Sequence, residues 1–104
     1  MRKLMTGAIA ASLLLVAGTA IAGGDAAAGK AKFAMCMGCH GANGVPTAPT
    51  YPPLAGKDAA YISEQLNAFR SGKRDNATMK AMAGGLTDAD VANLAAYIGT
   101  LPKP

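Results

Sequence analysis

Five consecutive residues, Cys36-Met37-Gly38-Cys39-His40, have the types and spacing that can attach a haem covalently. The pattern C-x-x-C-H is typical of a c-type haem site. Two thiols separated by two residues can each add to one vinyl group at the same edge of a porphyrin, and each addition forms a thioether. The histidine that follows is then held over one face of the ring, where an imidazole can bind iron as the proximal ligand. We therefore expect Cys36 and Cys39 to bind haem c and His40 to bind its iron.

The sixth position of the iron decides what such a haem can do. An open position permits ligand binding, whereas a thioether closes it and raises the reduction potential, which suits electron transfer. The chain has a single histidine, so a second imidazole ligand from the same chain is excluded. Met35 and Met37 adjoin the motif, so we expect them on the proximal side or pointing away. Met79 and Met82 lie in a stretch from Asp75 to Gly85 that we expect to be a flexible loop, and both are candidates for the sixth ligand.

The two cysteines also have an alternative interpretation, as a disulfide or a thiol redox pair. A disulfide between Cys36 and Cys39 would close a very short ring, so it would constrain little of the unfolded chain. Redox-active C-x-x-C pairs occur in thioredoxin-like proteins, which need a strand before the motif and a βαβ pattern around it. The sequence around the motif has neither pattern, so haem attachment is the favoured interpretation.

The first 22 residues have the organisation of a secretory signal peptide. A basic pair, Arg2 and Lys3, precedes a long apolar run and an A-x-A site that ends at Ala22. We expect cleavage after Ala22, which would leave residues 23–104 as one small domain in the periplasm. An uncleaved membrane anchor is the alternative, because the apolar run is nearly long enough to span a bilayer.

Charge and composition argue against several classes of function. The chain has ten Lys and Arg against six Asp and Glu. Two of the basic residues belong to the expected signal peptide, so the mature domain would carry a charge of about +2. The sequence has no basic run that predicts a nucleic-acid partner. It also has no carboxylate pair or Ser/His/Asp set that predicts an enzyme acting on a small-molecule substrate. A domain this small usually needs a disulfide, a metal or a cofactor to be stable.

Three helical segments and one long loop must position the motif. The segment from Asp25 to about Met35 has a candidate N-cap followed by alanines, which form helices well. The segment from Asp58 to about Ser71 has an apolar stripe at helical spacing, and a third helix begins at Thr87 with a capping box. Glycines and prolines exclude a regular helix from 41–57, and a loop this long in a small domain is normally functional. We expect a carbonyl in its proline-rich part, 51–54, to accept a hydrogen bond from the proximal histidine.

Three basic residues, Arg70, Lys73 and Arg74, lie near the end of the second expected helix. Positive charge is favoured there by the helix dipole. We interpret them as a solvated helix end rather than as a docking contact or as partners of the haem propionates.

Taken together, these motifs make residues 24–101 resemble a class I c-type cytochrome. The similarity is to the short bacterial monohaem cytochromes and to one half of the dihaem periplasmic ones. The motifs that carry it are Gly29…Phe33…Cys36-x-x-Cys39-His40, Gly41-x-x-Gly44, Tyr51-Pro52-Pro53-Leu54-Ala55-Gly56, Tyr61…Gln65-Leu66…Phe69-Arg70, and Met79…Leu86-Thr87-Asp88-x-Asp90…Leu94-Ala95-Ala96-Tyr97. The resemblance implies an all-α class I cytochrome c fold, with three main helices and long loops wrapped around one covalently attached haem. It also implies that the first and last helices cross, where Gly29 and Phe33 meet Tyr97.

The resemblance assigns two roles that the residues alone leave open. In the dihaem relatives, the methionine ligand stands seven residues before the leucine that opens the L-S/T-D segment. Counting back from Leu86 reaches Met79, so Met79 is implied as the sixth ligand, with Met82 as the alternative. The resemblance also implies that the carbonyl of Pro52 accepts the hydrogen bond of the proximal His40. The sequence has no second C-x-x-C-H motif, so a single haem and a single iron are expected.

The function that the resemblance implies is one-electron transfer in the bacterial periplasm. The iron would shuttle between Fe(III) and Fe(II), and would carry electrons from a quinol-oxidising complex or dehydrogenase to a terminal oxidase or reductase of a respiratory chain. Redox protein partners would dock weakly at the exposed haem edge of a monomer. The alternatives are a haem ligand binder or sensor with an open sixth site, and a cytochrome subunit of a larger redox complex.

Overall fold

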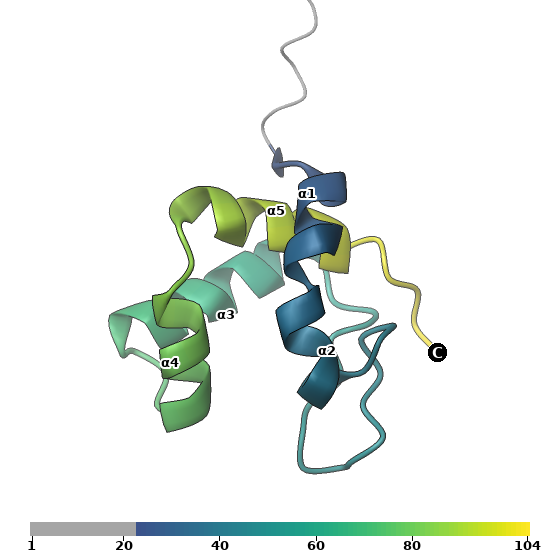
Figure 1. Ribbon diagram of the computed structural model, residues 1–104, viewed down its shortest axis with the longest axis horizontal. Coiled ribbons are helices and arrows are strands. Elements are labelled where there is room, and N and C mark those ends of the chain that lie inside the picture. Colours follow the sequence, from purple (N-terminus) through teal and green to yellow (C-terminus); the bar gives the residue numbers. More distant parts are fainter. Residues whose placement is uncertain (1–22) are drawn as a thin grey trace, which may run out of the picture.

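The computed structural model describes residues 23–104, so the expected signal peptide lies outside the described residues. In this part of the chain the secondary structure is helical, without strands (Figure 1). The five helices are α1 (Ala26–Lys32), α2 (Ala34–His40), α3 (Ala59–Ser71), α4 (Ala77–Gly84) and α5 (Asp88–Ile98). The expected all-α class is therefore confirmed. Among residues 23–104, no helix has both the length and the apolar character needed to span a bilayer.

Side-chain caps fix where the helices begin. Asp25 accepts the backbone N–H of Ala27 at 2.9 Å, and Asp58 accepts that of Tyr61 at 2.8 Å. Thr87 and Asp90 form a reciprocal capping box, with each side chain accepting the other residue's backbone N–H at 3.0 Å. A cap of this kind stabilises a helix by about 1 kcal/mol. The starts of α1, α3 and α5 are thus dictated by local sequence, as expected.

Helices α1 and α5 cross in close contact. A Cβ atom on Gly29 would lie 1.9 Å from the carbonyl oxygen of Asn93, so only glycine permits this approach. The rings of Phe33 and Tyr97 pack beside it, with their centroids 5.3 Å apart. A hydrogen bond also links the start of α1 to α5, because Asn93 Oδ1 accepts the backbone N–H of Asp25 at 2.8 Å. The crossing that the cytochrome resemblance implied is therefore confirmed.

The first helical segment differs from the expectation at its end. One helix was expected from Asp25 to about Met35, but the structure has two, which meet at Phe33. At the break the backbone makes a tighter, 3₁₀-type turn. The N–H of Cys36 donates to the carbonyl of Phe33, three residues back, at 2.8 Å. As a result, α2 carries the whole Cys36–His40 motif on a helix of its own.

The segment from Asp75 to Gly85 is also not the flexible loop that we expected. Most of it is helix α4. The side chain of Asn76 caps this helix by accepting the N–H of Met79 at 2.9 Å. Ala83 is fully buried on the inner side of the helix. The two candidate methionines are therefore held on a helix rather than on a mobile loop.

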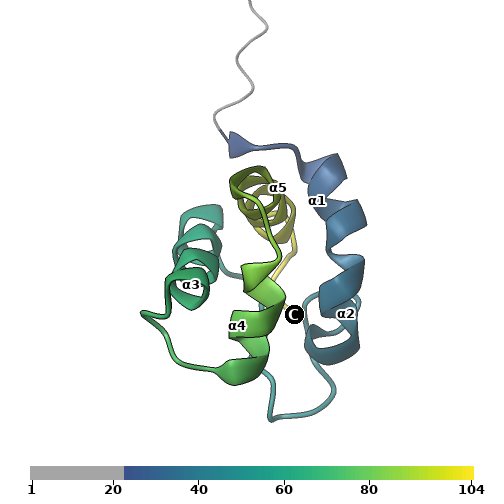
Figure 2. The ribbon, with the colours of Figure 1, turned by 60° about the vertical axis from the view of Figure 1, so that its left-hand side comes forward.

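The hydrophobic core lies along α5, where α1 and α3 pack against it. Figure 2 shows α5 at the back, with α3 and α4 on one side and α1 and α2 on the other. The buried core residues are Phe33, Ile62, Phe69, Ala83, Leu86, Val91, Leu94, Ala95 and Ile98. Helices α2 and α4 pack against this core through Cys36, Met37 and Met79.

Candidate haem-binding site

A cavity of about 470 Å³ opens between α2 on one side and α3 and α4 on the other. The segment 50–54 closes part of its edge, and residues of α5 form its floor. Its walls are mostly apolar, and they include every residue that the sequence singled out as a haem or iron ligand: Cys36, Cys39, His40, Met79 and Met82. The fold therefore gathers residues of α2 and α4 that lie 39 to 46 positions apart in the sequence.

Helix α2 brings the motif residues to a single face. Cys36, Cys39 and His40 stand at positions i, i+3 and i+4, which share one side of a helix, and all three line the cavity. Both cysteines are free thiols. Cys39 is exposed and Cys36 is half-buried. This is the arrangement that attachment of a porphyrin by two thioethers requires.

The ionisation of Cys36 bears on the thiol-redox alternative. Burial raises the pKa of the Cys36 thiol above its ordinary value, because a thiolate is disfavoured in an apolar environment. Nucleophilic cysteines of redox-active C-x-x-C motifs have a lowered pKa instead. The direction of the shift at Cys36 is therefore opposite to the one that the thiol-redox alternative needs at this cysteine.

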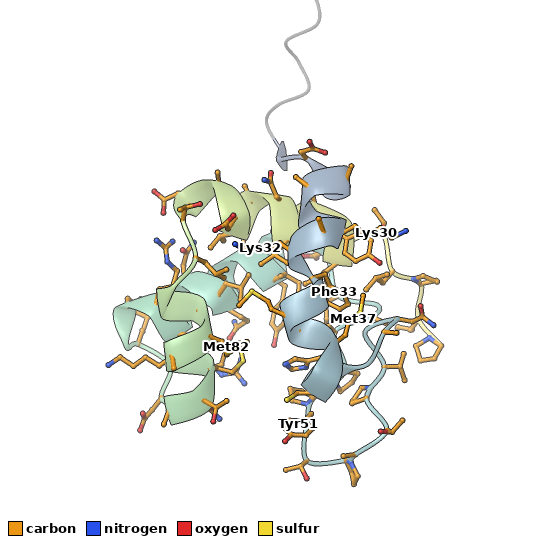
Figure 3. All side chains as sticks on the ribbon, viewed as in Figure 1. Lys30, Lys32, Phe33, Met37, Tyr51 and Met82 are labelled. Carbon is orange, nitrogen blue, oxygen red and sulfur yellow. The ribbon has the colours of Figure 1, made fainter. Side chains whose placement is uncertain are left out.

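The imidazole of His40 is oriented by the loop that follows it. His40 is only 8% exposed, and its Nδ1 lies 2.9 Å from the carbonyl oxygen of Pro52. When Nδ1 carries the proton and donates it to this carbonyl, Nε2 keeps its lone pair for a metal. The ring of Tyr51 stands edge-on to the imidazole, with the centroids 6.4 Å apart. Figure 3 shows Tyr51 below the end of α2.

Hydrogen bonds between residues 44 and 54–55 hold the loop 41–57 in place, in addition to its prolines. The backbone turns at Gly41, where φ is +89° and a Cβ atom would lie 2.0 Å from the carbonyl oxygen of Val45. The carbonyl of Gly44 then accepts the N–H groups of Leu54 at 2.8 Å and Ala55 at 3.0 Å. These bonds fix the far end of the loop, so that Pro52 faces the imidazole.

Helix α4 contributes the thioethers. Met79 and Met82 are three residues apart on this helix, and both are half-buried and line the cavity. Figure 3 shows Met82 on the side of α4 that faces α2. Met79 also packs against the buried core. Met35 lines the cavity at its rim, and Met37 packs against the core cluster.

Two polar residues of the cavity wall were not predicted from the sequence as site residues. Gln65 of α3 accepts a hydrogen bond from Nη1 of Arg74 at 2.7 Å, and both line the cavity. The two residues are nine positions apart and belong to different segments, so no local pattern in the sequence indicates that they meet. Arg70, by contrast, bonds to Asp88 at 2.8 Å and does not line the cavity.

The residues of the cavity fit a haem of the c type. One wall offers two thiols and an imidazole, and the facing wall offers neutral, soft thioether sulfurs, which are donors that haem iron accepts. The remaining walls are mostly apolar side chains that suit a flat porphyrin. Among the residues that line the cavity there is no Asp or Glu, so nothing there opposes the propionate groups of a haem.

Comparison with known proteins agrees with this description. Residues 26–102 match the family model described as Cytochrome c. Cytochrome c-554(548) of Halomonas halodenitrificans is 47% identical over 77 residues, which are 71% of this chain and 93% of that protein. Cytochrome c4 of Pseudomonas aeruginosa is 45% identical over 92 residues, which are 86% of this chain but 46% of that protein. The chain thus spans about half the length of the cytochrome c4 relative.

Comparison of the fold with solved structures also finds cytochrome c4. The crystal structure of reduced recombinant cytochrome c4 from Pseudomonas stutzeri superposes with a TM-score of 0.70 at 36% sequence identity, covering 75% of this chain and 46% of that chain. The expected resemblance to one half of the dihaem cytochromes is therefore confirmed. By its sequence, its fold and the C-x-x-C-H face of its cavity, the chain belongs to the cytochrome c family, and its domain binds a covalently attached haem c.

Proposed function

We propose that this chain is a single-haem electron carrier. In this proposal Cys36 and Cys39 would hold the haem by thioethers, and His40 and Met79 would be the ligands of its iron. The observation that carries the proposal is one cavity whose walls combine the C-x-x-C-H face of α2 with the thioethers of α4. The bound haem supplies an iron that gains and loses one electron between Fe(II) and Fe(III). The family match supports this electron-transfer role.

The chain's own residues have two tasks in electron transfer. The carbonyl of Pro52 fixes the orientation of His40 and so keeps the iron-binding nitrogen directed at one place in both oxidation states. The apolar walls and a neutral thioether ligand favour the less charged ferrous iron, and this raises the reduction potential. The proposed role needs no bond-making chemistry, so we assign no enzymatic activity to the chain.

Partners are proposed to dock where the haem edge would be reachable. Cys39 is exposed, and the rim residues Met35 and Tyr51 are 39% and 40% exposed. A small, partly apolar rim suits the weak and brief encounters of redox proteins. We propose that a quinol-oxidising complex or a dehydrogenase supplies the electron and that an oxidase or reductase accepts it from the monomeric carrier.

The proposed location follows from the N-terminal sequence. Export and removal of residues 1–22 would leave 23–104 in the periplasm. Sequencing the N-terminus of the protein isolated from the periplasmic fraction tests this point, with Gly23 as the expected first residue. An intact N-terminus in the membrane fraction would support the uncleaved anchor instead.

Absorption spectra in both oxidation states, together with the intact mass, test the proposed function. We expect the mass of one added haem, low-spin spectra, a methionine–iron band at the red end of the oxidised spectrum, and no binding of carbon monoxide by the reduced protein. A high-spin spectrum with carbon monoxide binding would support the ligand-binding alternative. A haem-free chain with two titratable thiols would refute the proposal altogether.

A further inference from the structure

Leu101, which lies just after α5, is bonded to the loop that orients His40. Its own position is fixed by the end of the helix, because its N–H donates to the carbonyl of Ile98 at 3.0 Å. Its carbonyl then accepts the N–H of Gly56, in the loop 41–57, at 3.1 Å. Figure 1 shows the C-terminal segment, in yellow, beside the loop that follows α2. The loop is therefore hydrogen-bonded to the end of α5 as well as to itself.

The side chain of Leu101 covers the point at which the loop closes. A Cβ atom added to Gly44 would lie 3.0 Å from Cδ1 of Leu101 and 3.0 Å from the backbone nitrogen of Ala55. Gly44 is buried, and its carbonyl accepts the N–H groups of Leu54 and Ala55. Leu101 is half-buried and packs against the hydrophobic core. Its side chain thus contacts both the core and the base of the loop.

The base of the loop sets the position of the Pro52 carbonyl. Pro52 stands two residues before the Leu54 N–H that bonds to Gly44, and its carbonyl oxygen lies 2.9 Å from His40 Nδ1. A shift of residues 54–56 relative to α5 would therefore move this carbonyl relative to the imidazole. Leu101 does not line the cavity, so a change at this position would reach the site through the protein and not by contact with a bound haem.

We propose that Leu101 is a positioning residue for His40, which it holds through the base of the loop and the carbonyl of Pro52. The proposal rests on the proposed function, because it requires His40 to be an iron ligand. A hydrogen bond donated by Nδ1 makes an imidazole a more basic ligand. Because a more basic ligand favours ferric over ferrous iron, a well-placed Pro52 carbonyl lowers the reduction potential.

Two measurements on the holoprotein report on this contact. The chain has one histidine, so the imidazole N–H signal in the NMR spectrum of the reduced protein belongs to His40. The rate at which this proton exchanges with deuterium oxide measures how often its bond to Pro52 opens. For Leu101→Ala we expect exchange about tenfold faster, which corresponds to an opening that costs about 1.4 kcal/mol less. Potentiometry should show a higher reduction potential for the same variant.

Val91→Ala is the matched control. Val91 is buried in α5, at the opposite end of the helix from Leu101, and does not line the cavity. Its truncation removes apolar contacts from the core, so we expect an unchanged potential and no more acceleration at His40 than at the backbone amide of Phe69, a buried residue of α3. Leu101→Met keeps an apolar side chain of similar volume, and should restore the wild-type exchange rate and potential.

Equal exchange rates and potentials for the wild-type protein and Leu101→Ala would overturn the proposal. So would an acceleration at His40 that is no larger than the one at the Phe69 amide, because Leu101 would then stabilise the fold as a whole. If Leu101→Ala does not fold, Leu101→Val removes a single methylene and gives the same comparison with smaller shifts in the same directions. Failure of the proposed function would appear differently, as a wild-type protein whose mass includes no haem.

Discussion

His40 illustrates how the loop that follows α2 orients a side chain that we propose as an iron ligand. Its Nδ1 faces the carbonyl of Pro52 at 2.9 Å, and a proton on Nδ1 would be donated to this carbonyl and leave Nε2 available. The carbonyl is fixed in turn by the bonds of Gly44 at the base of the loop. The proximal side of the site is therefore determined by backbone geometry, which most side-chain substitutions in the loop would preserve.

The two methionines of α4 give a sharp test at the residue scale. We expect Met79→Ala to lose the methionine–iron band, to bind carbon monoxide when reduced, and to have a lower reduction potential, because the thioether no longer favours ferrous iron. Met82→Ala is the matched control, since it removes the same group one helical turn away and should keep all three properties. Absorption spectra and potentiometry measure them. The reverse pattern would identify Met82 as the ligand.

The sequence could predict that Cys36, Cys39 and His40 share one face, but it could not predict every residue that lines the cavity. Cys36, Cys39 and His40 lie within one helical turn, so their spacing alone brings them together. The choice between Met79 and Met82 could not be derived this way, because both positions on α4 face the same cavity; it depends on the family resemblance. The contact between Gln65 and Arg74 depends on how the chain turns after α3, which no local pattern encodes.

At the scale of elements, the helix starts were predictable where a cap stood in the sequence. The eight-residue helix α4 was not predicted, because a helix this short is unstable alone. It forms where the Asn76 cap combines with the burial of Ala83 and the packing of Met79 against the core. The break at Phe33 was missed for a similar reason, since it depends on a tight turn between two helical segments.

The crossing of α1 and α5 should tolerate no side chain at its centre. Gly29→Ala would put a Cβ atom 1.9 Å from the Asn93 carbonyl oxygen, so the helices must separate. We expect a loss of about 1–3 kcal/mol, which is typical of overpacked interiors. Gly84→Ala is the control: no atom lies within 4 Å of its Cβ position, so it should be neutral or stabilising by up to about 1 kcal/mol. Denaturant unfolding of the holoproteins measures both, and equal stabilities would contradict the close crossing.

At the scale of the whole molecule, the haem cavity and the hydrophobic core share their residues. Ile62, Phe69, Leu94 and Ile98 belong to the buried cluster and also line the cavity. A haem in the cavity would cover the apolar faces of these residues, and each Å² of apolar surface removed from water stabilises the folded state by about 25 cal/mol. Folding of this domain should therefore depend on the haem.

The double variant Cys36→Ala/Cys39→Ala tests this dependence, because it removes both points of attachment. We expect the haem-free chain to have much less helix by far-UV circular dichroism and no cooperative thermal transition. Met79→Ala is the matched control: it loses an iron ligand but keeps the attached haem in the cavity, so it should unfold cooperatively. A haem-free double variant with native helix content and a sharp transition would mean that α1, α3 and α5 form a sufficient core by themselves. The cavity would then be a preformed receptor for haem, rather than a part of the core that haem completes.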